Sequence, residues 1–447
     1  MGGNIIMSLK LAGFFFGCVF LFSNTVLQAS SSLKSGGYDA DTQKITQSRT
    51  SSINLHDAIN KTFENNPALR SFSYALKAQG GKQLQASMAN SPELSFVIED
   101  AFGSGDFKGT DNAQATLSIA WVIEGEVRRG HMEVAQAGTA SFSTQAKLKR
   151  LDAAAETARL YMVALAYQAR LNNAIKTEEL AKETVSAVEK HVAAGKAPEA
   201  ELARARAAFS QQQLGYEDIE HELSSVFHLL AAQWGDTQPE FSRVEGDILN
   251  LPLVISFETL KTLLNRSPEF TRMMSDKRLM QAKLKLAQSQ SASQWRVNLG
   301  IRHFETTDDK ALVAGIAIPF GERSRNTGNI IEARENVSQI LAKVDELKVK
   351  FYTALYVLSQ ELQHSLHRVT MYRSQIIPQL EKALNETRRA YDLGRYSYLE
   401  WRSVQADLLS ARSALVESSI NAHLKVIEIE RLTGVPMEQV SAAQSAR

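Results

Sequence analysis

The chain has 447 residues, and its 50 lysines and arginines almost balance its 49 aspartates and glutamates, which leaves a net charge of +1. This balance argues against a nucleic-acid-binding protein with a basic surface, and the 44% content of hydrophobic residues argues against a wholly disordered chain. The single cysteine, Cys18, excludes a disulfide framework or a zinc–cysteine site elsewhere. We therefore expect no nucleic-acid partner, no cofactor and no resident metal.

Residues 1–29 have the order of a secretory signal peptide. Lys10 precedes an apolar stretch over residues 11–27, and Leu27-Gln28-Ala29 offers a small-residue cleavage site. The alternative is a transmembrane anchor, but the stretch is short for spanning and lacks a basic stop-transfer flank. Residues 30–52 are rich in Ser, Thr, Gly and Gln and are expected to form a flexible leader.

The remaining chain is predicted to contain two repeats, residues 53–235 and 236–435, followed by a tail over residues 436–447. Each repeat has the order short helix, two strands, long helix, glycine break and long helix. Landmarks of the first repeat recur in the second after 197 to 201 residues, as expected of two similar structural units. The pairs are Asn66-Pro67 with Ser267-Pro268, Ile119-Ala120 with Ile316-Ala317, and Gly195-Lys196 with Gly394-Arg395.

Four segments alternate large apolar side chains with polar or small ones, at residues 93–99, 115–123, 295–303 and 311–318. This alternation is typical of transmembrane barrel strands, although a soluble antiparallel sheet packed on one side shows it too. Open strand edges are not stable in hydrocarbon, and small barrels need at least about eight strands. If the strands span a membrane, several copies of the chain must therefore pool them.

The first long helix of each repeat is predicted over residues 130–193 and 329–392. Pro378, inside the second of these, should bend or interrupt it. Glycines just after both helices, Gly195 and Gly394, are typical of left-handed C-terminal caps. Ser397 and Glu400 then form a predicted capping box for the following helix. Each repeat should thus contain one antiparallel helical hairpin.

The second long helix of each repeat has apolar residues seven positions apart over five successive heptads. This spacing predicts a coiled-coil seam, with ordinary amphipathic bundle helices as the alternative. The predicted seam comprises Leu202, Phe209, Tyr216, Leu223 and Leu230 in the first repeat and Trp401, Leu408, Leu415, Ala422 and Ile429 in the second.

The duplicated unit of two strands and a helical hairpin, behind a signal peptide, resembles the TolC family of outer-membrane efflux ducts over about residues 53–435. Asn90–Ser95 (NSPELS) and Phe102–Gly105 (FGSG) are similar to the first strand and loop of the CzcC-type subgroup, outer-membrane components of heavy-metal efflux systems. Residues 318–320 with 325–328 resemble that subgroup's second junction between barrel and helix. The segment from Gly394 to Glu400 resembles its second hairpin tip.

The resemblance implies a mainly α fold with a β-barrel part. Long helical hairpins would form a periplasmic tunnel, and four transmembrane strands per chain would contribute to the 12-stranded barrel of a homotrimer in outer-membrane lipid. It also implies two partners, a periplasmic membrane-fusion adaptor and an inner-membrane RND pump. The implied functional residues are Gly195, Lys196, Gly394, Arg395, Tyr396 and Ser397 at adaptor-docking tips, Glu400 at a periplasmic gate, and Pro319, Arg325, Asn326 and Gly328 at the barrel–helix junction.

Two departures from the family pattern concern the first junction and the gate. Residues 121–129 lack the expected proline, and Ser403 stands where the family often has another acidic residue. Glu400 is therefore either part of a gate or only a member of the capping box. Gly195 and Gly394 are likewise either adaptor contacts or only helix caps.

The preferred function is the outer-membrane channel of a tripartite RND efflux system that exports heavy-metal cations of the cobalt, zinc and cadmium type. The alternatives are a duct for multidrug efflux or type I secretion, and a periplasmic coiled-coil adaptor. No H-E-x-x-H, G-x-S-x-G or G-x-x-x-x-G-K motif points to an enzyme. Histidines that share a helix face, His221 with His228 and His364 with His367, lack a third ligand for a metal site.

Overall fold

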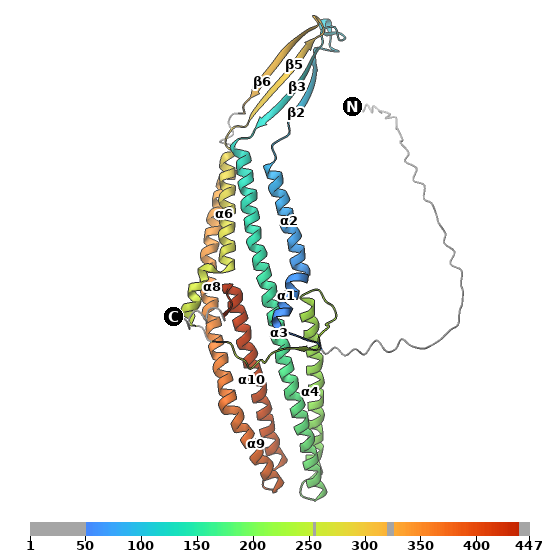
Figure 1. Cartoon of the computed structure of the whole chain (residues 1–447), viewed down its shortest axis with the longest axis vertical. Helices are drawn as coiled ribbons and strands as arrows, with labels where there is room; N and C mark the ends of the chain where they lie inside the picture. Colours follow the sequence, from blue (N-terminus) through green and yellow to red (C-terminus); the bar gives the residue numbers. More distant parts are fainter. Residues whose placement is uncertain (1–50, 254–255, 320–325, 438–447) are drawn as a thin grey trace, which may run out of the picture. The chain divides into compact units, whose positions relative to one another are not determined.

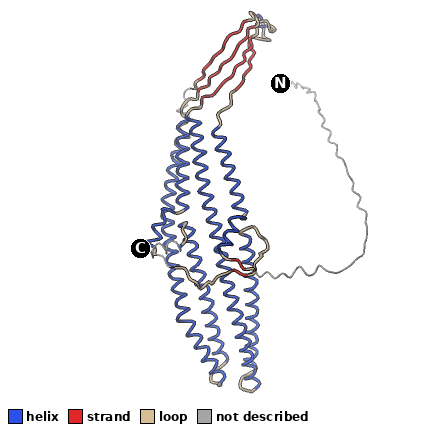
Figure 2. The backbone as a smooth tube through the Cα atoms, viewed as in Figure 1, coloured by secondary structure: helices blue, strands red, loops and turns tan. Residues whose placement is uncertain are grey.

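The computed structural model describes residues 51–253, 256–319 and 326–437, which form long helices and a four-stranded sheet (Figures 1 and 2). The predicted signal peptide, the leader up to residue 50, Arg325 and residues 438–447 lie outside the described residues. The fold class is the predicted one, mainly α with a smaller sheet. Among the described helices, none is both long enough and apolar enough to cross a membrane.

The sheet is antiparallel and has the strand order β2-β3-β5-β6, which leaves β2 and β6 at its edges. Its register pairs Phe96 with Leu117 and Leu117 with Ile301, so most of the large apolar residues share one face, with Val97 and Phe304 among the exceptions on the other. No other layer of the described residues packs against that face, since Leu94 is 75% exposed and Leu312 is 73% exposed. The strands are Glu93–Glu99 (β2), Gln114–Ile123 (β3), Trp295–Phe304 (β5) and Asp309–Ala317 (β6).

Each strand of the sheet is connected to one helix of a four-helix layer (Figure 1). In chain order α2 leads into β2, β3 into α3, α6 into β5, and β6 toward α8. Contacts join α2 to α3, α3 to α6, and α6 to α8, so the helices follow the order of the strands. Their bounds are Pro67–Ser87 (α2), Glu126–Ala193 (α3), Pro268–Ser289 (α6) and Thr327–Met371 (α8).

The helices directly before the first strands of the two predicted repeats begin with similar caps. The side chain of Asn66 accepts a hydrogen bond from the Leu69 amide at the start of α2, and Ser267 accepts one from the Phe270 amide at the start of α6. In both helices a proline occupies the first position, where no amide donor is needed. Shorter helices precede each: Leu55–Asn65 (α1) before α2, and Phe257–Leu263 (α5) with the 3₁₀ turn Leu264–Arg266 (η2) before α6.

Two helical hairpins form the rest of the fold, α3 with Glu199–Ala232 (α4), and α8 and Ile377–Asp392 (α9) with Tyr398–Thr433 (α10). The helix predicted over residues 329–392 is interrupted by a π-helical turn, Tyr372–Ile376 (η3), just before Pro378. Because proline lacks an amide proton, the preceding turn loses one helical hydrogen bond, and the wider turn accommodates this loss. The first repeat has no such interruption over the 68 residues of α3.

The predicted seam positions are all at least half-buried in the hairpins. The three in the middle of the helices, Phe209, Tyr216 and Leu415, are half-buried. The buried positions are Leu202, Leu223, Leu230, Trp401, Leu408, Ala422 and Ile429.

A small parallel sheet packs against the middle of α3 and joins segments far apart in sequence. Its strands are Ser52–Ile53 (β1) and Arg243–Val244 (β4). Ser52 was predicted to belong to the flexible leader, and its pairing with Arg243 corrects that boundary. The buried hydroxyl of Tyr161 lies 3.0 Å from the Ile53 carbonyl oxygen and 2.5 Å from that of Glu245. The Gln168 side chain donates to the Val244 carbonyl and accepts from its amide. These bonds fix the start of the described chain to the helices.

Candidate functional site: sheet faces, junctions and hairpin tips

The polar face of the sheet is crossed by ion pairs between strands that are not neighbours. Arg302 on β5 reaches over β3, where it donates to Thr116 and Gln114, and ends 2.9 Å from the carboxylate of Glu99 on β2. Arg296 on β5 lies 3.0 Å from Glu93 on β2. The opposite face carries exposed aromatic and aliphatic side chains, so the sheet has one charged and one apolar surface.

The connection from β6 to α8 is anchored at Asn326, the junction residue that the sequence singled out. Its buried side-chain amide donates to the Ala287 carbonyl near the end of α6 and lies 3.2 Å from the Ser291 hydroxyl. Pro319 is exposed and accepts a hydrogen bond from Ser293, while Gly328 is exposed without close neighbours. These hydrogen bonds therefore join the connection between α6 and β5 to the connection between β6 and α8. Arg325 lies outside the described residues.

The first junction, which lacks the expected proline, contains a glycine in a left-handed backbone conformation. Gly125, just before α3, has a φ of +49°, a conformation that favours a residue without a Cβ. A proline has a φ near −65° and does not fit this backbone.

The two hairpin tips have the same backbone structure. The Lys196 amide donates to the His191 carbonyl at 2.8 Å, and the Arg395 amide donates to the Ala390 carbonyl at 2.8 Å. The amides of Gly195 and Gly394 also donate to the carbonyls three residues earlier, those of Val192 and Tyr391, which completes a Schellman cap at each tip. Gly195 has a φ of +70° and Gly394 a φ of +69°, so both positions use the freedom of glycine.

The second tip exposes a small apolar surface that the sequence analysis did not identify. Leu393 is 67% exposed, Tyr396 is 46% exposed and Leu399 is 52% exposed. Of the predicted tip residues, Lys196, Arg395 and Ser397 are exposed too. Leu393 and Leu399 were missed because a single apolar residue beside a turn has no periodic signal. The structure therefore brings apolar and basic side chains together at this tip.

An aromatic cluster beneath the tips joins the two hairpins. Tyr391 stacks on His191 with ring centroids 4.6 Å apart and on Trp401 at 5.2 Å. Burial, together with nearby Glu201, raises the pKa of Tyr391 to about 12. Within the described chain the Tyr391 hydroxyl and the Trp401 indole nitrogen are buried without hydrogen-bond partners. Burial also raises the pKa of Tyr398, which packs in the same cluster.

Glu400 completes the capping box at the start of α10. Its carboxylate accepts from the Ser397 amide at 2.7 Å and from the Ser397 hydroxyl at 2.9 Å. These two hydrogen bonds, the backbone one first, lower the pKa of the Glu400 carboxyl. The side chain is exposed at the tip, so the capping role is visible in the structure and the gate role stays a prediction.

Glu400→Gln should remove a pH-dependent part of the stability of α10. A carboxyl whose pKa is lowered on folding stabilises the fold above its unfolded pKa, and this contribution disappears as pH falls through the lowered value. We expect the variant to melt below wild type at pH 7 and the difference in melting temperature to shrink at pH 3, by circular dichroism. Glu417→Gln, at an exposed position of the same helix, should show no such change. An equal difference at both pH values would contradict this account.

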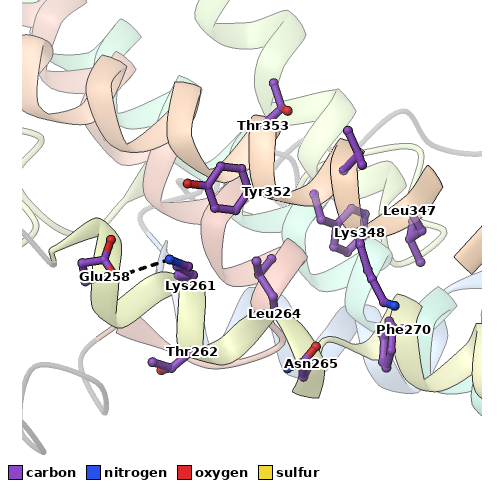
Figure 3. Close-up of a pocket in the computed structure, with 12 residues that line it drawn as sticks. Glu258, Lys261, Thr262, Leu264, Asn265, Phe270, Leu347, Lys348, Tyr352 and Thr353 are labelled. Carbon is purple, nitrogen blue, oxygen red and sulfur yellow. Dashed lines mark ion pairs between the residues drawn. The ribbon is translucent and has the colours of Figure 1, made fainter. Parts of the chain in front are cut away.

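A groove of about 660 Å³ lies between α5 and α8 (Figure 3). Leu264, Phe270 and Leu347 line it, and the Lys261–Glu258 ion pair, at 3.6 Å, borders it. Along α8 the groove continues into exposed apolar positions such as Val349, which is 69% exposed. This edge of the helix layer is therefore apolar and uncovered in the isolated chain.

The predicted histidine pairs are exposed on helices α4 and α8. No group of three or more His, Cys, Asp or Glu residues is arranged to hold a metal ion in the part of the chain that the structure describes. The features with functional geometry are therefore the two-faced sheet, the tied junction and the hairpin tips.

Residues 58–235 match the family model of the outer membrane efflux proteins. The cobalt-zinc-cadmium resistance protein CzcC of Cupriavidus metallidurans is 23% identical over 382 residues, which cover 86% of this chain and 90% of that protein. A membrane protein from Pseudomonas aeruginosa has a TM-score of 0.73 at 14% identity, with 85% and 90% of the two chains covered. CusC has a TM-score of 0.70 at 15% identity, with 89% and 98% covered.

These matches confirm the resemblance to outer-membrane efflux proteins that the sequence motifs predicted.

Proposed function

We propose, on the premise that residues 58–235 belong to the outer membrane efflux protein family, that the chain is the outer-membrane channel of a tripartite RND efflux system. It contributes a passage and no catalysis. A periplasmic membrane-fusion adaptor and an inner-membrane RND pump are its partners, and the pump supplies the energy. The likeness to CzcC over most of both chains carries this proposal.

The edges of the sheet support assembly as a homotrimer. With three antiparallel pairings between them, β2 and β6 run in opposite directions, so β6 of one copy has the orientation to pair antiparallel with β2 of the next. Three copies of four strands give a 12-stranded barrel in which every edge amide has a partner, as hydrocarbon requires. The exposed apolar face then contacts lipid, and the polar face lines the pore.

The two ends of the helix layer can also pack against neighbouring copies around the same ring. Its two ends are α2, none of whose residues is buried, and α8, whose groove and apolar positions are uncovered. A head-to-tail ring buries both ends against neighbouring copies. The hairpins extend this ring as a tunnel, and the exposed tips at Gly195 and Gly394 are the surface offered to the adaptor.

We propose heavy-metal cations of the cobalt, zinc and cadmium type as the cargo. The support is the CzcC relative, whose name states resistance to these metals, together with the NSPELS and FGSG motifs. The similarity to CusC and other solved channels bears on the fold alone. Multidrug efflux or type I secretion is the second candidate, since the duct geometry suits any soluble cargo.

Deletion of the gene tests the cargo. We expect sensitivity to cobalt, zinc and cadmium, with growth unchanged on dyes, detergents and antibiotics, and recovery when the intact gene is restored. Sensitivity to dyes and drugs in place of metals would move the protein to the multidrug branch. A heat-dissociable trimer in the outer-membrane fraction is expected as well, whereas a protein found only in the soluble periplasmic fraction would favour the adaptor alternative.

A further inference from the structure

The long polar side chains of the sheet lie flat along its surface. Arg302 uses each of its three guanidinium nitrogens: Nε donates to the Thr116 hydroxyl at 2.9 Å, Nη1 to the Gln114 side-chain oxygen at 3.0 Å, and Nη2 to the Glu99 carboxylate at 2.9 Å. These partners lie on β3 and β2, so one side chain spans three strands. Arginine is suited to this role because its planar fork is rigid and always charged.

A second arginine occupies the other end of the same face. Arg296 Nη1 lies 3.0 Å from one carboxylate oxygen of Glu93, and Nη2 donates to the other at 3.2 Å. Both oxygens of Glu93 are therefore engaged in a two-pronged pair. The two carboxylates of β2 that point to the polar face, Glu93 and Glu99, each have an arginine partner from β5.

The surface between the two pairs is small and uncharged. One row of the register contains Ser95, Ser118 and Gly300, and a Cβ on Gly300 would come within 2.6 Å of the Leu117 carbonyl oxygen. In the next row Asn298 lies directly over Gly315, where a Cβ would collide with its amide. Glycine at both positions lets the neighbouring polar side chains remain close to the sheet.

We propose that Arg296 and Arg302 prevent the pore-facing carboxylates of Glu93 and Glu99 from retaining divalent cations. The inference rests on the proposed function, in which this face lines the duct and metal cations pass along it. Carboxylate oxygens are good ligands for divalent cations, and passage requires that each contact be weak enough to release the ion. Arg296 engages both carboxylate oxygens of Glu93, Arg302 engages Oε2 of Glu99, and each arginine adds a positive charge that repels the cargo.

One further carboxylate faces the same side at the end of β6. Asp309 pairs in register with Phe304, is exposed, and makes no ion pair within the described residues. It lies in the same register row as Glu99, on the edge strand β6 next to the turn between β5 and β6, and is paired with neither Arg296 nor Arg302. The proposal therefore concerns Glu93 and Glu99, and Asp309 stays unchanged in every variant below.

The purified trimer in planar lipid bilayers tests this proposal, with cadmium chloride as the probe. In R296Q/R302Q the carboxylates lose their cationic partners. We expect cadmium to reduce the current of this variant at about tenfold lower concentration than for wild type, a change that corresponds to the loss of a charge-assisted contact. The matched control, E93Q/E99Q/R296Q/R302Q, lacks the carboxylates too and should return to the tolerance of wild type.

The following results would contradict either the role of the arginines or the proposed function. Equal cadmium block in wild type and R296Q/R302Q would overturn the role of the arginines, and so would a control variant as sensitive as the double variant. If R296Q/R302Q does not form trimers, R296Q alone serves, because Arg296 holds a single partner whereas Arg302 joins three strands. A wild-type trimer without channel current would instead contradict the proposed function.

Discussion

Replacement of both tip glycines by leucine, G195L/G394L, is expected to abolish metal resistance and cross-linking to the adaptor while the trimer still forms. A Cβ at either position has no heavy atom within 4 Å, so the added side chain extends away from the chain's own structure. The cost to the hairpin is the left-handed backbone alone, roughly 1–2 kcal/mol for each non-glycine residue. A complete loss of docking then reflects a blocked contact surface. Resistance on metal plates and cross-linking in whole cells measure the effect.

Two control variants separate docking from backbone strain. Gly105, in the loop between β2 and β3, has a φ of +62° and equally open surroundings, so G105L carries the same backbone cost in a loop of the sheet that is not part of either hairpin tip. We expect G105L to keep full resistance. Asparagine tolerates the left-handed conformation better than leucine, so G195N/G394N should retain partial cross-linking. Normal cross-linking by G195L/G394L would contradict tip docking.

The strands, the buried helix positions and the helix ends could be predicted from local periodicities and turn residues in the sequence. Period-two alternation locates the four strands within two residues of their bounds, because each residue's face follows directly from its position in a strand. The heptad positions of α4 and α10 coincide with buried or half-buried residues, and the glycines mark the ends of α3 and α9. These signals lie within short windows, and tertiary contacts reinforce them without redirecting them.

Contacts between distant segments could not be predicted from the sequence, because they depend on strand register and helix packing. The Arg302–Glu99 pair joins positions 203 residues apart and requires the pairing of three strands to be known. The bond of Tyr161 to the Ile53 carbonyl joins positions 108 residues apart, and nothing local to either residue signals it. The aromatic cluster of Tyr391 and Trp401 likewise depends on how the two hairpins pack. The sequence thus predicted the motifs of the candidate site separately, and the structure shows which residues of the same chain they contact.

That cluster leads to the second large effect, at Trp401. The side chain is 1% exposed, stacks on Tyr391, and packs with Leu202 of the other hairpin. Truncation of a buried aromatic residue typically costs about 3–5 kcal/mol, because transfer energy is lost and a cavity remains. We expect W401A to lower the midpoint of thermal unfolding of the helical part, measured by circular dichroism on the purified trimer, and to lower metal resistance with it.

The unpaired indole nitrogen of Trp401 makes a sharper comparison possible. Within the described chain it has no hydrogen-bond partner, so W401F removes no hydrogen bond and keeps most of the ring contact with Tyr391. A buried donor without a partner is itself unfavourable, and its removal offsets part of the lost volume. We therefore expect W401F to unfold much closer to wild type than W401A does. L415A, at a half-buried position of the same seam, should fall between them, whereas equal losses in W401F and W401A would show that the indole nitrogen has a partner in the assembled trimer.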